Sequence, residues 1–104
     1  MKAMMTKHAS QDRFDRIGAI IDLYNGEFGD VVITTWSEEH QTFQDLTSNG
    51  ILIARGENNT IVTMFLCSIN KAIAMQNISG VFLTKNQWRR IKENQKYKKL
   101  CGEI

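Results

Sequence analysis

At 104 residues, 42% of them hydrophobic and none of them proline, the chain has the size of one globular domain with a single core. Seven glycines and no proline exclude collagen-like and low-complexity classes, and no run approaches the roughly 18 to 20 apolar residues of a membrane helix. The net charge of +2 hides an asymmetry, because residues 1–84 carry six Lys/Arg against nine Asp/Glu, whereas residues 85–104 carry seven against two. We expect one α+β domain over 1–84, with 85–104 as its basic C-terminal helix or tail.

The two cysteines, Cys67 and Cys101, belong to no CxxC motif and no Cys/His cluster. This spacing does not indicate a structural zinc site, and we expect no metal and no cofactor. The first eight residues lack the apolar region of a signal peptide. We therefore expect reduced thiols and a cytoplasmic protein.

Residues 11–25 are predicted to form the N-terminal helix, with Ser10 as N-cap and Asn25-Gly26 as the stop. At about 100° per residue its apolar side chains share one arc, formed by Phe14, Ile17, Ile20, Ile21 and Tyr24. Arg13 falls on the same arc, where burying an unpaired charge is costly. Either Arg13 reaches water from a frayed first turn, or it lines a cleft and binds an anion.

The middle of the chain is predicted to hold three strands, over 31–36, 51–55 and 60–67, with a hairpin loop at 56–59. Both faces of the 60–67 strand are apolar, so we expect it in the middle of the sheet, covered on each side. Between the first two strands, Ser37 as N-cap predicts a helix that ends at Asn49-Gly50. His40 would then be a solvated histidine on that helix.

For residues 70–76 the pattern leaves helix and strand open, and residues 81–83 are predicted to form a short strand. Thr84 and Gln87 resemble a capping box that opens a helix over 85–100, with Trp88, Ile91 and Gln95 as a narrow docking stripe. This helix is either simply solvated or contacts a polyanion. In the second case its cations bind phosphates and its rings stack on bases, so the candidate nucleic-acid-binding residues are Lys85, Trp88, Arg89, Arg90, Lys92, Lys96, Tyr97, Lys98 and Lys99.

Two separated segments together resemble a known group of proteins. The run Thr6-Lys7-His8-Ala9, followed by Arg13, Arg16 and Gly18, is similar to the T-K-H-A-x-x-R-x-x-x-R-x-G opening of small phage and prophage proteins. The pair 51–55 and 60–65 resembles the "I-(I/V)-T-(V/M)" strand that those proteins carry after a short turn. They look related to the RelE-like and colicin-like RNases, whose α+β domains pack N-terminal helices on a four-stranded antiparallel sheet. The resemblance covers residues 6–75.

The resemblance implies the fold and the site. The fold would be an N-terminal helix packed on a small, mainly antiparallel sheet of three to four strands. The basic C-terminal helix from residue 85 onward, which we expect after this sheet, is not part of the resemblance. His8, Arg13 and Arg16 would form an anion-binding, acid–base cluster that Thr63 faces. One departure matters: Arg13 follows His8 by five residues rather than four. The two side chains therefore converge only if the helix begins after Ser10.

Two functions follow as expectations. The first is a metal-independent RNA endonuclease or toxin-like phage protein, because a histidine with a reference pKa of about 6.5 moves protons near neutral pH and arginines stabilise charge on a phosphate. The alternative is a non-catalytic, phage-derived module that binds nucleic acid or a host protein. The expected partners are RNA or the ribosome, or a host or antitoxin protein, and no membrane.

Overall fold

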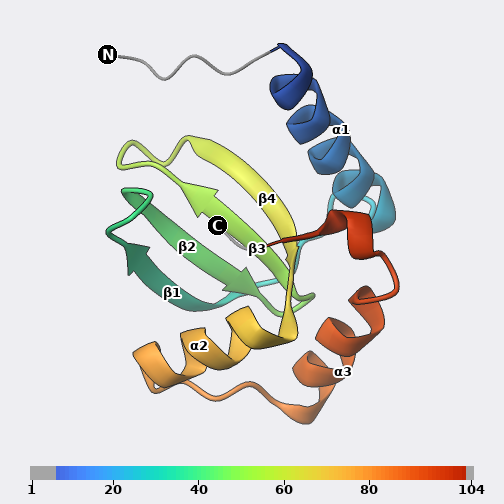
Figure 1. The fold of residues 1–104 in the computed structure, drawn as a ribbon. Helices are drawn as coiled ribbons and strands as arrows, with labels where there is room; N and C mark the ends of the chain where they lie inside the picture. Colours follow the sequence, from blue (N-terminus) through green and yellow to red (C-terminus); the bar gives the residue numbers. More distant parts are fainter. Residues whose placement is uncertain (1–6, 103–104) are drawn as a thin grey trace.

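The computed structural model describes residues 7–102 of the chain, and the side chains of residues 13–102 (Figure 1). The fold is α+β, as predicted, with a four-stranded antiparallel meander extended by a two-residue strand that lies parallel to β4. No helix among these residues is long and apolar enough to cross a membrane. The elements in chain order are α1 (Lys7–Leu23), β1 (Val31–Ser37), β2 (Thr42–Thr47), β3 (Ile51–Arg55), β4 (Ile61–Cys67), α2 (Ile69–Ser79), α3 (Lys85–Asn94), the 3-10 helix η1 (Lys98–Leu100) and β5 (Cys101–Gly102).

The sheet separates two hydrophobic clusters, because successive side chains of a strand point to opposite faces. On one face Leu52 of β3 packs in a cluster with Met75 of α2 and Ile91 of α3. On the other face Ile51 packs with Ile20 of α1. Residues 69–79, for which the sequence left helix and strand open, form the helix α2 that completes the first cluster.

Helix α1 begins at Lys7, so Ser10 lies inside the helix and is not its N-cap. The helix ends at Leu23, and the predicted stop is confirmed by a turn in which Asn25 and Gly26 both have positive φ. The apolar arc is narrower than predicted, since Phe14 is 66% exposed and Ile21 is 41% exposed. The reason is that α1 packs along β4 at one side of the sheet, which covers only a narrow stripe of the helix.

Residues 38–41 form a turn and residues 42–47 form β2, so the predicted helix after Ser37 is wrong. The Ser37 hydroxyl does accept a hydrogen bond from the backbone N–H of His40 at 3.2 Å, but this bond closes the β1–β2 hairpin turn. His40 consequently lies in a turn and not on a helix. A serine hydroxyl can therefore make the hydrogen bond expected of a helix N-cap in a turn that no helix follows.

The apolar residues of β2 explain why residues 42–47 form a strand and not a helix. Phe43 and Leu46 would share one side of a helix, whereas in the strand they lie on opposite faces of the sheet. Phe43 packs edge-on against Trp36 of β1, with ring centroids 4.9 Å apart, and Leu46 is completely buried in the first cluster. Pairing with both β1 and β3 makes β2 a central strand of the sheet.

Among the described residues, β5 pairs with β4 at Leu66 and Cys67, whereas the preceding residues of β4 pair with β3 alone. The first residues of β4, Ile61 and Val62, are 52% and 40% exposed, so the prediction of a strand covered on each side holds only for its C-terminal half. Cys67 and Cys101 are not joined to each other by a disulfide, and burial raises the pKa of the Cys101 thiol.

The C-terminal part departs from prediction in two ways. Residues 81–83 form no strand, and Phe82 is 74% exposed in the connection between α2 and α3. The basic helix ends at Asn94 rather than at residue 100. The docking stripe is confirmed, because Ile91 is buried, Trp88 packs against the first cluster, and the Gln95 side chain donates to the carbonyl of Cys67 at 3.1 Å.

The buried Asn94 side chain joins three parts of the fold. Its amide N–H donates to the carbonyl of Asn49 in the β2–β3 turn at 2.9 Å, and its carbonyl accepts from the Tyr24 hydroxyl at the end of α1. Burial raises the pKa of Tyr24, and the bond to Asn94 opposes that shift. Gly50 has φ 79, and a Cβ atom there would approach Asn94 to 2.8 Å. This tight contact fixes α3 against the β2–β3 turn.

The capping box of α3 is present in both directions. The Thr84 hydroxyl accepts from the Gln87 backbone at 3.2 Å, and the Gln87 side chain accepts from the Thr84 backbone at 2.9 Å. We expect Thr84→Ala to lower the free energy of unfolding by about 1 kcal/mol, measured by urea denaturation. Thr84→Ser, which keeps the hydroxyl, should remain within about 0.5 kcal/mol of the wild type. Equal losses in the two variants would contradict the capping role.

Candidate functional site

A pocket of about 260 Å³ opens where α1 passes the β1–β2 turn end of the sheet, and we call it the sheet-end pocket. At this end of the sheet Ala54 of β3 pairs with Thr63 of β4, which places both side chains on one face of the sheet. The small Ala54 side chain leaves space above β3, while α1 forms one wall. The pocket is lined by Arg13, Arg16, His40, Thr42, Ala54, Val62, Thr63 and Phe65.

Arg16 is held against β4 by several contacts. Its Nε donates to the Met64 carbonyl at 3.0 Å and an Nη donates to the Thr63 hydroxyl at 2.6 Å. Its guanidinium carbon lies 3.8 Å from the centre of the Phe65 ring, a cation–π distance. The guanidinium therefore supplies a hydrogen-bond donor along the part of β4 that β5 does not reach, and it is a fixed cation at the wall of the pocket.

Arg13 lies three residues before Arg16, close to the same side of α1, and also lines the pocket. The sequence left open whether Arg13 reaches water or lines a cleft, and the structure places it at a cleft. Of the described residues that line this pocket, three are arginine or histidine and none is acidic. The Glu39 carboxylate lies 3.8 Å from Nε2 of the His40 ring. This composition suits an anion.

His8 lies within α1, but its side chain is outside the described residues. Because the helix starts at Lys7, His8 and Arg13 are separated by about 140° of helix rotation. The condition for their convergence, a helix that begins after Ser10, is not met. The role of His8 stays a prediction, whereas Arg13, Arg16 and Thr63 do lie together.

The histidine that lines the pocket is His40, which the sequence analysis placed on a solvated helix. Thr42 is also missed by that analysis, because it belongs to the same misassigned segment. The available signal was the hairpin itself: strands 31–37 and 42–47 separated by a turn bring His40 to the end of the sheet. Recognising β2 as a strand would have been needed to find either residue.

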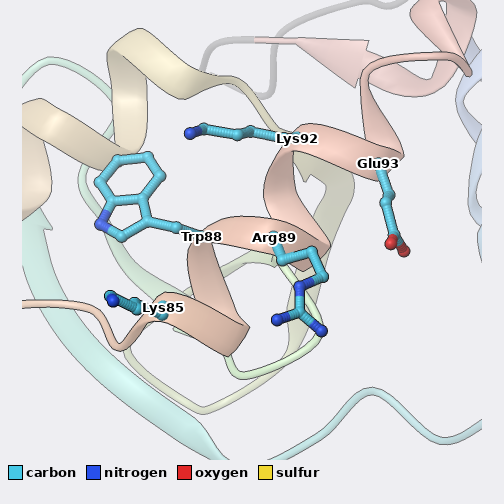
Figure 2. Close-up of a pocket in the computed structure, with 5 residues that line it drawn as sticks. All are labelled: Lys85, Trp88, Arg89, Lys92 and Glu93. Carbon is cyan, nitrogen blue, oxygen red and sulfur yellow. The ribbon is translucent and has the colours of Figure 1, made fainter.

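A second cationic surface lies on α3, around a shallow hollow of about 580 Å³. Figure 2 shows Lys85, Trp88 and Lys92 pointing to one side of α3, whereas Arg89 and Glu93 point away from them. We call the first three residues the α3 face. Trp88 is half-buried, so its ring contributes to the core while it also lines the hollow.

The remaining predicted nucleic-acid-binding residues do not continue this face, because the helix ends at Asn94. Arg90 lies 3.7 Å from the Glu93 carboxylate. Lys96 lies over the Tyr97 ring at 5.2 Å, and Lys98 and Lys99 belong to η1. The basic segment is therefore two separate groups, on α3 and around η1, and not one continuous stripe.

Helix α3 and the β1–β2 turn lie at opposite ends of the sheet (Figure 1). Helix α3 contacts the β2–β3 turn through Asn94, whereas the pocket adjoins the β1–β2 turn. The α3 face and the sheet-end pocket have no lining residue in common, so they are two distinct surfaces.

Within residues 7–102, no group of three or more His, Cys, Asp or Glu side chains is placed to hold a metal ion. Comparison of the chain with protein-family models, curated proteins and solved structures finds no significant match.

The contacts of the two arginines predict different responses to substitution. Arg16→Lys should lower the free energy of unfolding by about 1–2 kcal/mol, because an ammonium cannot keep both hydrogen bonds and the stacking on Phe65. Arg13→Lys, the matched control one turn away, should change it by no more than about 0.5 kcal/mol. Urea denaturation measures both values. An Arg16→Lys variant as stable as the wild type would mean that these contacts contribute little.

Proposed function

We propose that the protein binds single-stranded nucleic acid through the α3 face. The observation that carries this proposal is the alignment of Lys85, Trp88 and Lys92 on one side of a helix that its capping box and docking stripe hold in place. The charge distribution supports it, since residues 85–104 carry seven Lys/Arg against two Asp/Glu while the rest of the chain is acidic.

Each residue of the α3 face has a distinct role in this proposal. Lys85 and Lys92 are both exposed and are about 10 Å apart along the helix axis, which lets them contact different phosphates. The accessible part of Trp88 lies between them and stacks on one unpaired base. Such contacts depend on the phosphate backbone and on any π-face, so the binding is tolerant of sequence and sensitive to salt.

The salt dependence of binding tests this role. Neutralising two phosphate contacts lowers the slope of log K against log salt by about 1.4 on a single strand. We therefore expect the double variant Lys85→Gln/Lys92→Gln to show a slope smaller by this amount, measured by fluorescence anisotropy with a labelled oligonucleotide.

The matched control is Lys98→Gln/Lys99→Gln, which removes the same charge from η1. Its slope should stay close to that of the wild type if the α3 face makes the contacts. An equal decrease in both double variants would show that only the overall charge matters, and the α3 face would then have no special role.

A second candidate function, RNA cleavage without a metal ion, is favoured by the composition of the sheet-end pocket. Arg13, Arg16 and Thr63, which the resemblance assigns to the site, line it together with His40. In this proposal His40 takes the proton from a ribose 2′-OH, the 2′ oxygen attacks phosphorus, and the bond to the 5′ oxygen breaks. The 5′ oxygen takes a proton from water or from a second acid, for which His8 is the predicted group. The arginines stabilise the charge on the phosphoryl oxygens.

End-labelled RNA incubated with the purified protein in EDTA tests this candidate. We expect the wild type to leave 2′,3′-cyclic phosphate ends and His40→Ala to leave the RNA intact, because the acid–base group is lost. His40 is in an exposed turn, so this variant should keep its thermal stability. Cleavage kept by His40→Ala and lost by His8→Ala would return the role to His8. Intact RNA with the wild type would leave only the binding function.

A further inference from the structure

The sheet-end pocket is lined by one buried polar group that no described residue satisfies, and a second such group lies beside it on β2. The hydroxyl of Thr42 and the side-chain N–H₂ of Gln44 are buried without a hydrogen-bond partner. Thr42 is 5% exposed and Gln44 is 1% exposed. Buried polar side chains in folded proteins are nearly always paired, so an unpaired group at a pocket marks a place where something else supplies the partner.

Thr42 is one of the residues that line the pocket, whereas Gln44 is not. Gln44 follows two residues later on the same face of β2 and pairs with Ala54 of β3, which does line the pocket. The Thr42 hydroxyl therefore belongs to the sheet side of the cavity, and the Gln44 side chain lies next to it.

The lining of the pocket divides into three chemical parts. Arg13 and Arg16 supply positive charge beside the His40 ring, which suits a phosphate group. Val62 and Phe65 supply apolar surface that suits a ring. Thr42 supplies a hydrogen-bonding hydroxyl on the sheet side.

A single ligand that meets all three requirements carries a phosphate, a ring and an oxygen acceptor. We propose that the sheet-end pocket binds one phosphorylated nucleoside, with the phosphate at Arg13 and His40 and with an oxygen of the sugar or base accepting from the Thr42 hydroxyl. The volume of about 260 Å³ limits the ligand to one such unit. A free nucleoside monophosphate and the phosphorylated end of an RNA strand share this chemistry. The proposal depends neither on binding by the α3 face nor on RNA cleavage.

The unpaired hydroxyl makes possible a test that separates stability from binding. Thr42→Val removes a hydroxyl that has no partner among the described residues, so the melting temperature should stay the same or rise. Thr47→Val is the matched control on the same strand, because the Thr47 hydroxyl is buried and accepts from the backbone N–H of Ile51 at 3.2 Å. This second variant should melt at a lower temperature and bind the ligand as the wild type does.

Binding is measured by titration with uridine and adenosine monophosphates, followed by the amide signals of His40, Thr42 and Gln44 in NMR spectra. We expect saturable shifts with the wild type and about tenfold weaker binding, or weaker still, with Thr42→Val. Uridine and inorganic phosphate alone should bind more weakly than the monophosphates. No saturable shift with either monophosphate would overturn the proposal, as would inorganic phosphate binding as tightly as they do. A Thr42→Val variant that melts as low as Thr47→Val would also overturn it, since the hydroxyl would then have a partner within the protein.

A dinucleotide with a 5′-phosphate, compared with the same dinucleotide without it, distinguishes the two sources of the ligand. The pocket and the α3 face share no lining residue, and the Lys85→Gln/Lys92→Gln variant measured in parallel shows any contribution of the α3 face. Tighter binding of the phosphorylated dinucleotide than of the monophosphates assigns the site to an RNA end, and the reverse order assigns it to a free nucleotide. Equal binding of the two dinucleotides would contradict recognition of the phosphate.

Discussion

The structure depends on the polar central strand β2, whose buried side chains must find partners within the sheet. Asp45 accepts a hydrogen bond from Arg55 at 2.6 Å, and Thr47 accepts one from the backbone where β3 begins. Both pairs tie β2 to β3, and such pairing offsets the cost of burying polar groups. On the other face of the strand, Thr42 and Gln44 have no such partner among the described residues. A central strand that satisfies its polar groups on one face and not on the other points to the unsatisfied face, at its Thr42 end, as a candidate binding site.

The position of α1 determines the shape of that end. Arg16 attaches the helix to β4 through a backbone carbonyl, a hydroxyl and an aromatic ring, at the part of the strand that β5 does not cover. Arg16 thus covers part of an exposed strand edge, a position where natural sheets commonly carry cationic residues. The same side chain also supplies the positive wall of the pocket. Arg13, one turn earlier, extends this cationic wall to the rim. Helix docking and anion recognition therefore depend on the same side of α1.

The two cationic surfaces are separated because the chain anchors each to a different turn of the sheet. Asn94 holds α3 against the β2–β3 turn, whereas the pocket adjoins the β1–β2 turn. The α3 face is open and suits a flexible polymer recognised by its backbone charge. The sheet-end pocket is small, partly apolar and lined by an unpaired hydroxyl, which suits a single defined ligand.

The sequence by itself determined the elements whose signals are local: the strands at 31–37, 51–55 and 61–67, the stop after α1, and the capping box at Thr84. It also placed Arg13 at a core edge, because helix periodicity depends only on neighbouring residues. Only the tertiary structure decided that residues 42–47 form a strand, and so that His40 and Thr42 join Arg16 at one pocket. The physical reason is that β2 has weak local signals and gains its stability from cross-strand partners ten or more residues away, which no short window of sequence contains.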